Sequence, residues 1–77
     1  MPITDFASEI LETEIVLTHI EDGHVYHFPI LSNGIVSLHG SRIEANPKAN
    51  CEASLYLSDA RDAAQTALRR SQEYFAL

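Results

Sequence analysis

Two stretches in the first half of the chain are rich in the β-branched and aromatic residues that half-buried β-strands favour. They are "EIVLTHI" (residues 14–20) and "HVYHFPIL" (residues 24–31). Between them lies Asp22-Gly23, and Asp-Gly is a strong signal for a two-residue hairpin turn. Such a turn would pair Thr18 with His27. It would also give both strands one shared apolar face, which we expect to be the core face: Ile15, Leu17, Tyr26, Phe28 and Ile30.

The next connection, "SNG" (residues 32–34), is compatible with two strand registers. A two-residue turn would place Phe28 opposite His39 and continue the core face into polar residues. A three-residue loop with Gly34 in the left-handed conformation would keep that face apolar. Because a shift of one residue moves every side chain to the other face, we predict the three-residue loop. The pairs that it predicts are Phe28 with Leu38, Ile30 with Val36, and Tyr26 with Gly40.

A fourth strand is predicted for "NCEASLYL" (residues 50–57), which follows a proline turn at "NPKA" (residues 46–49). Paired with the third strand (residues 35–41), it would add Leu55 and Leu57 to the core face. The predicted sheet is therefore a four-stranded antiparallel meander.

The last third of the chain has the apolar spacing of an α-helix. Ser58 is a suitable N-cap, and small or apolar residues then recur every three or four positions. We expect a helix over residues 59–76 that packs across the core face. The residues of this stripe are Ala60, Ala63, Ala64, Ala67, Leu68, Ser71, Tyr74 and Phe75.

A short helix is also predicted near the N-terminus, in "TDFASEILE" (residues 4–12). Phe6 and Ile10 are four residues apart, and Thr4 or Asp5 could cap the first turn. The predicted fold is thus α+β: a four-stranded antiparallel β-meander, one C-terminal α-helix packed across one face, and a short N-terminal helix. We expect a single domain of residues 1–77.

The net charge of −6 is concentrated in one half of the chain. Residues 1–41 contain six acidic residues and no Lys or Arg, whereas residues 42–77 contain five acidic and five basic residues. A field of this sign repels phosphate backbones, so direct nucleic-acid binding is not expected. Such a surface can serve solubility alone, or it can contact a protein partner with a basic surface. The acids expected to steer such a partner are Glu9, Glu12, Glu14, Glu21 and Asp22.

Cys51 is the only cysteine, so no internal disulfide can form, and a reducing, cytoplasmic compartment is favoured. We expect its thiol to face the core and to be inert. There is no apolar run long enough to span a membrane and no basic leader followed by an apolar segment, so neither a membrane anchor nor a signal peptide is expected. Small domains without disulfides often gain burial by oligomerising. Either the N-terminal segment or a second copy of the chain would cover the open sheet face, and we expect a homodimer through it.

The predicted register places one polar or aromatic residue from each strand in a row on that open face: Thr18, His27, His39 and Tyr56. His27 and His39 would be about 5 Å apart, a spacing at which two imidazoles can hold a metal ion. Tyr56 and Thr18 are poor ligands, so the set is incomplete and no metal or cofactor is predicted. We expect these four residues to form a binding surface. The chain has no nucleophile elbow, P-loop, HExxH, GxGxxG or paired CxxC motif, and we expect no enzymatic activity.

The segments "HVYHFP" and "SDARDAAQTAL" are loosely similar to small antitoxins of the HicB type, but the region between them departs from that pattern, so no family is assigned. The sequence therefore predicts a small acidic interaction module that binds or modulates another protein, as phage or mobile-element inhibitors of this size do. The alternative is a metal- or small-ligand-binding domain centred on His27 and His39.

Overall fold

The protein is seen here in a computed structural model that describes the backbone of residues 6–76 and the side chains of residues 6–72. Its strands are β1 (Phe6–Ile10), β2 (Glu14–His19), β3 (Val25–Pro29) and β4 (Arg42–Glu44). They form an antiparallel sheet in the order β1-β2-β3-β4. A 3-10 helix, η1 (Ala53–Tyr56), leads directly into helix α1 (Leu57–Ala76).

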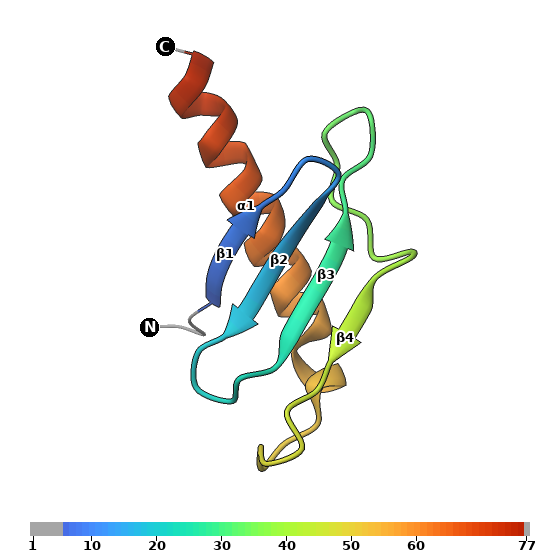
Figure 1. The fold of residues 1–77 in the computed structure, drawn as a ribbon. Coiled ribbons are helices and arrows are strands. Elements are labelled where there is room, and N and C mark those ends of the chain that lie inside the picture. The colour runs from blue at the N-terminus through green and yellow to red at the C-terminus, as the bar shows by residue number, and fades with distance from the viewer. Residues whose placement is uncertain (1–5, 77) are drawn as a thin grey trace.

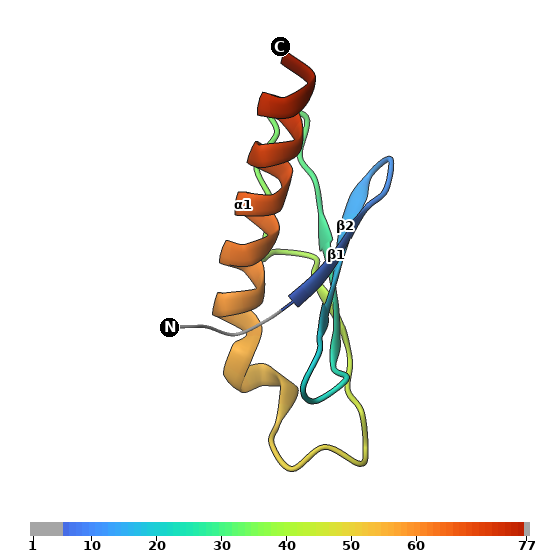
Figure 2. The same ribbon diagram turned by 90° about the vertical axis from the view of Figure 1, so that its left-hand side faces the viewer.

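Helix α1 runs across one face of the sheet, and no other described helix or strand covers the opposite face (Figures 1 and 2). This arrangement confirms the predicted α+β fold, with a four-stranded antiparallel sheet and a C-terminal helix. Among the helices described, none is long and apolar enough to cross a membrane.

The N-terminal segment is a β-strand, so the short helix predicted there is wrong. β1 pairs with β2, with Phe6 opposite His19 and Ile10 opposite Ile15, and Leu11 N–H donates to Glu14 O across the turn at 2.8 Å. A spacing of four residues fits the period of a strand as well as that of a helix. The edge of β2 that faces away from β3 offers backbone N–H and C=O groups, and hydrogen bonds to these groups make residues 6–10 a strand and not a helix. The proposed caps, Thr4 and Asp5, lie outside the described residues.

The β2–β3 hairpin has a longer turn than the sequence predicted. His19 N–H donates to His24 O at 2.8 Å, which closes a four-residue loop over residues 20–23. Thr18 therefore pairs with Val25, not with His27. The register differs from the prediction by two residues, which leaves every side chain on its predicted face. The core residues predicted on these strands are accordingly confirmed: Ile15, Leu17, Tyr26 and Phe28 are all buried.

The three-residue loop at residues 32–34 is confirmed, but the strand predicted after it is not. Ile30 bridges Val36, and Gly34 has a φ of 84°, in the left-handed region that glycine tolerates. Ser37 N–H donates to Pro29 O at 3.0 Å, and the chain then leaves the sheet. The reason is that Pro29 has no N–H with which to return a hydrogen bond to Ser37, so the ladder cannot continue there.

β4 takes the place that the predicted third strand would have filled. Tyr26 pairs with Ile43 and His27 with Arg42, so the predicted pairs of Phe28 with Leu38 and Tyr26 with Gly40 are wrong. The predicted fourth strand is also absent, because its residues form an irregular segment, η1 and the start of α1. Two predicted core residues are exposed as a result: Leu38 by 48% and Leu55 by 68%.

The core lies between the sheet and α1. Ala60, Ala64 and Leu68 face the sheet from the helix and are buried, as the predicted stripe requires. The alanines allow the helix backbone to approach closely. Ala53 of η1 and Val36 complete the buried cluster.

Side chains of α1 complete the hydrogen bonding of the loop that follows β3. Val36 N–H donates to Gln65 Oε1 at 2.9 Å, and Gln65 Nε2 donates to Gly34 O at 3.2 Å. Arg61 Nε donates to Val36 O at 3.0 Å. The Gln65 amide thus makes the backbone hydrogen bonds that a neighbouring strand would otherwise make to this segment, which has left the sheet.

Candidate functional site

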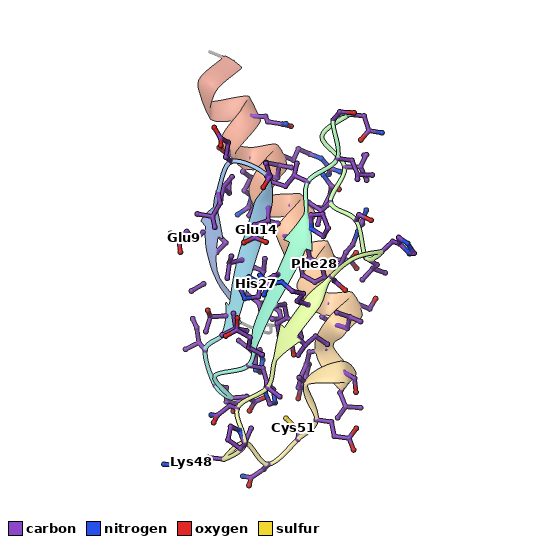
Figure 3. The ribbon with its side chains drawn as sticks, turned by 45° about the vertical axis from the view of Figure 1, so that its right-hand side comes forward. Glu9, Glu14, His27, Phe28, Lys48 and Cys51 are labelled. Atoms are coloured by element: carbon purple, nitrogen blue, oxygen red, sulfur yellow. The ribbon has the colours of Figure 1, made fainter. Side chains whose placement is uncertain are left out.

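The uncovered face of the sheet, which we call the open face, is formed by alternate residues of all four strands. One row of directly opposed residues consists of Glu9, Val16, His27 and Arg42. The adjacent row consists of Ala7, Thr18, Val25 and Glu44. Glu14 lies on β2 beyond the first row, opposite Pro29. Figure 3 labels Glu9, Glu14 and His27 on this part of the sheet.

His27 lies between two carboxylates at the centre of the open face. Its Nε2 is 2.7 Å from Glu44 Oε2 and its Nδ1 is 3.7 Å from Glu14 Oε2. Arg42 NH2 is 3.7 Å from the other oxygen of Glu14. The imidazole is only 14% exposed, and its Nδ1 has no hydrogen-bond partner. A protonated His27 would therefore carry its positive charge between the carboxylates of Glu14 and Glu44.

The structure does not bring together the four residues that the sequence placed in one row. His39 lies in the exposed loop after Ser37, where its N–H donates to Ser37 Oγ at 3.1 Å. Tyr56 belongs to η1, and its ring stacks on the buried ring of His19 at a centroid distance of 4.6 Å. Only Thr18 and His27 remain on the open face. The predicted pair of His27 and His39 does not form.

The predicted acidic residues separate into two groups at opposite ends of β2. Glu9 and Glu14 lie on the open face, and Glu12 is exposed in the β1–β2 turn beside them. Glu21 and Asp22 lie in the β2–β3 turn at the other end. Glu21 is exposed, whereas the Asp22 carboxylate is held against neighbouring side chains and is 14% exposed.

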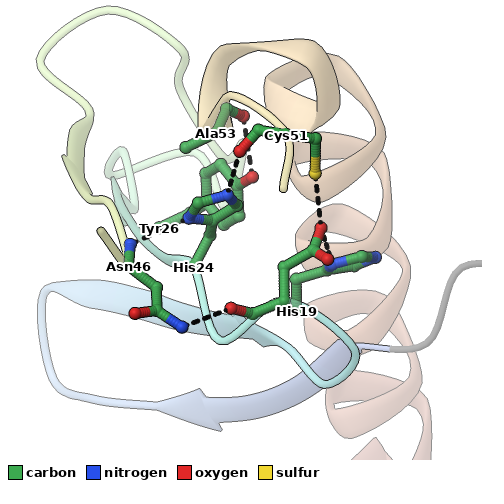
Figure 4. Close-up of polar contacts among 7 residues, drawn as sticks. His19, His24, Tyr26, Asn46, Cys51 and Ala53 are labelled. Carbon is green, nitrogen blue, oxygen red and sulfur yellow. Dashed lines mark hydrogen bonds and ion pairs between the residues drawn. The ribbon is translucent and has the colours of Figure 1, made fainter. Parts of the chain in front are cut away.

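A second polar cluster lies at the end of the sheet near the β2–β3 turn (Figure 4). His24 is 1% exposed and has both ring nitrogens in hydrogen bonds to backbone atoms. Its Nδ1 accepts from Asn46 N–H at 2.9 Å, and its Nε2 donates to Cys51 O at 2.9 Å. Asn46 Nδ2 in turn donates to Asp22 O at 2.7 Å. These contacts join the turn to residues 46–51.

The Asp22 carboxylate connects the remaining members of this cluster. Its Oδ2 is 2.9 Å from His19 Nδ1 and accepts a hydrogen bond from the Cys51 thiol at 2.9 Å. That bond lowers the pKa of Asp22 and raises the pKa of Cys51, because it stabilises the carboxylate and the protonated thiol together. The same thiol raises the pKa of Tyr56. Cys51 is half-buried and its thiol contacts the Asp22 carboxylate, so the expectation that this thiol faces the core is wrong.

Sequence reasoning could identify only part of this cluster. His19, Asp22 and His24 lie close together in the chain, but Cys51 and Asn46 reach them only through the fold.

Comparisons with known proteins gave no relative from which a function could be transferred. No protein-family model, curated protein or solved structure matches this chain.

Proposed function

We propose that this protein is a non-enzymatic interaction module that binds a protein partner with a basic surface through its open face. The observation that carries the proposal is that helix α1 covers one face of the sheet, while no element within residues 6–76 covers the other (Figure 2). Three carboxylates lie on the open face, those of Glu9, Glu14 and Glu44, against the single guanidinium of Arg42.

The side chains at the centre of this face support a binding role. Val16, Val25 and His27 are each partly buried, although no described element covers them. A partly apolar patch surrounded by charges is the arrangement of many protein interfaces. The carboxylates of Glu9 and Glu12 are exposed at one margin, where they would steer a basic partner and would lose that effect at high salt.

The absence of an activated nucleophile among the described residues supports a non-enzymatic role. The Cys51 thiol donates to a carboxylate and not to an imidazole, and a raised pKa disfavours the reactive thiolate. A single unpaired cysteine also supports a reducing, cytoplasmic setting.

A charge-reversal pair tests the proposal. Glu9→Lys with Glu12→Lys changes the margin of the open face, and Glu52→Lys with Asp62→Lys makes the same change of net charge at exposed positions near η1 and on α1. Wild-type protein first captures a partner from a lysate of the source organism at low salt. The partner is then identified and purified, and its association rate is measured by stopped flow with each variant.

The open-face variant should slow association about tenfold or more at low salt, because like charges then meet. The control variant should change the rate by less than about twofold. An equal effect of both variants, or an acidic partner, would contradict the proposal.

The homodimer remains a separate prediction. Binding of a second copy is less favourable than binding of a basic partner, because the carboxylates of the two open faces would lie against each other. Light scattering at about pH 7.5 and about pH 5.5 measures it on both sides of the ordinary histidine titration. A monomeric mass at both pH values would refute self-association.

A further inference from the structure

Among the described residues, His27 is the only histidine on the open face, and it lies between carboxylates that a basic partner would contact. We propose that protonation of His27 weakens the binding of such a partner, so that the open face binds it near neutral pH and releases it as the pH falls. This inference rests on the function proposed above and adds its regulation.

The hydrogen bond to Glu44 selects the tautomer of the neutral His27 ring. Nε2 is 2.7 Å from Glu44 Oε2, and because an ionised carboxylate can only accept, Nε2 carries the proton. Nδ1 then holds a lone pair, with less than 1 Å² of exposed surface and no hydrogen-bond partner. Glu14 Oε2, at 3.7 Å, cannot supply a proton either, because it is also an acceptor. The neutral ring therefore leaves one buried nitrogen unsatisfied.

A proton on Nδ1 replaces this unpaired lone pair by a donor beside a carboxylate. The ring then carries a positive charge 2.7 Å from Glu44 Oε2 and 3.7 Å from Glu14 Oε2. The His27 side chain is only 14% exposed, so salt and water screen these two contacts less than they screen contacts at the surface. Both carboxylates are then neutralised from within the protein, and each attracts a cation of the partner less strongly.

Charged groups from three strands surround the ring, and helix α1 packs on the opposite face (Figure 2). Glu14 of β2 and Glu44 of β4 favour the protonated form, and Glu9 of β1 lies in the same row as His27. Arg42, directly opposite His27 on β4, disfavours it, but its guanidinium lies 3.7 Å from Glu14 Oε1. The three carboxylates and the one guanidinium give these groups a net charge of −2, and protonation of His27 halves it to −1.

The proton and the basic partner thus compete for the same carboxylates. Histidine is the side chain that ordinarily titrates between about pH 5 and 8, whereas the lysines and arginines of a partner keep their charge there. The affinity for the partner should be highest above this range and should fall as the pH falls through it. Because the coupling is reciprocal, the partner should also expel the proton from His27 to water when it binds.

The test uses the full-length chain and, as the probe, a synthetic peptide of about ten lysines, whose charge is constant over the pH range. Its affinity is measured at low salt at about pH 7.5 and about pH 5.5, and amide NMR establishes where it binds. His27→Gln removes the titrating ring and keeps an amide that can donate to Glu44. His39→Gln removes a histidine from an exposed loop as the matched control. Circular dichroism establishes that each variant is folded. Independently of any variant, NMR follows the ring resonances of His27 in the wild type at about pH 6 as the peptide is added.

The wild type should bind the peptide about fivefold or more weakly at the lower pH, His39→Gln should keep that ratio, and His27→Gln should reduce it to less than about twofold. Bound peptide should move the His27 resonances toward those of the neutral ring. Equal affinity of the wild type at both pH values, equal ratios in the two variants, or His27 resonances that do not respond to bound peptide would each overturn this inference alone. A peptide that binds away from the open face, or not at all, would overturn the proposed function and this inference with it.

Discussion

Gln65 should contribute more to stability than a surface position on a helix normally does. Its side-chain amide accepts from Val36 N–H at 2.9 Å and donates to Gly34 O at 3.2 Å. Val36 is completely buried, so its N–H has no access to water when the glutamine is removed. The substitution Gln65→Ala deletes both of these hydrogen bonds, and a longer one that Arg61 donates to Gln65 Oε1 at 3.4 Å, without changing the core.

The magnitude follows from the two bonds. A buried donor left unpaired costs about 1–3 kcal/mol, and an ordinary hydrogen bond contributes about 0.5–1.5 kcal/mol. The Gly34 carbonyl is less buried and can be hydrated, so losing the hydrogen bond to this carbonyl costs little stability. Alanine gains a few tenths of a kcal/mol, roughly, in helix propensity. We expect a net loss of about 1–3 kcal/mol, or about 4–8 °C in melting temperature for each kcal/mol.

Chemical denaturation followed by circular dichroism measures this loss, and Thr66→Ala is the control because Thr66 is the exposed neighbour on the same helix. The control should change stability by no more than about 0.5 kcal/mol. Gln65→Glu keeps the acceptor for Val36 and loses the donor to Gly34, so its free energy of unfolding should lie between those of Gln65→Ala and Thr66→Ala. Hydrogen exchange at the Val36 amide gives a local reading: protected in the wild type, and faster in Gln65→Ala. Equal stability of Gln65→Ala and Thr66→Ala would refute the reasoning.

Three further substitutions test other parts of the fold. Phe28→Ala should cost about 3–5 kcal/mol in denaturation experiments because Phe28 is fully buried, whereas Leu38→Ala should cost about 0.5 kcal/mol or less, and similar losses would contradict the observed register. Burial raises the pKa of Tyr26 to about 12 from an ordinary value of 10.0, so the unfolded chain ionises first and stability should fall as the pH rises between these values. Tyr26→Phe should lose less stability than the wild type in alkaline denaturation, and an unchanged pH dependence of stability would contradict the assignment of this loss to Tyr26. Gly23→Ala should cost about 1–2 kcal/mol, because Gly23 has a φ of 79° and a Cβ there would lie 3.0 Å from Asn46 Nδ2; a melting temperature equal to that of the wild type would show the strain argument to be mistaken.

The parts of the fold that depend on local chemistry could be predicted from the sequence. The alternation in residues 14–31 gave the correct inward face of β2 and β3, and an error of two residues in the turn left that face unchanged. Gly34 correctly indicated a three-residue loop with a left-handed residue. The small-residue stripe at Ala60, Ala64 and Leu68 correctly placed the helix on the sheet.

The errors arose where a distant segment decides the outcome. Phe6 and Ile10 suit a helix or a strand equally, and only the free edge of β2 makes them a strand. The missing N–H of Pro29 was visible in the sequence and is the signal that could have ended the third strand early. Ala53 lies two helical turns before Ala60, the first residue of the stripe of α1. This spacing could have indicated that the segment belongs with the helix and not with the sheet.

The candidate sites were likewise not predictable where they depend on segments that are distant in the chain. The row of His27 and His39 depended on a strand that does not form, so the pair was lost with it. The cluster around Asp22 depends on contacts between residues 29 positions apart, Asp22 with Cys51, which no local pattern specifies.

The most direct test of the interaction module is amide-resolved NMR of the labelled protein titrated with the basic partner recovered by capture. If the open face is the binding surface, the largest shift changes should fall on its central rows, at residues such as Val16, Thr18 and His27 on β2 and β3. The exposed side of α1, including Asp62, Thr66 and Arg69, should be unaffected. Shift changes concentrated on α1, with the open-face amides unchanged, would contradict the account.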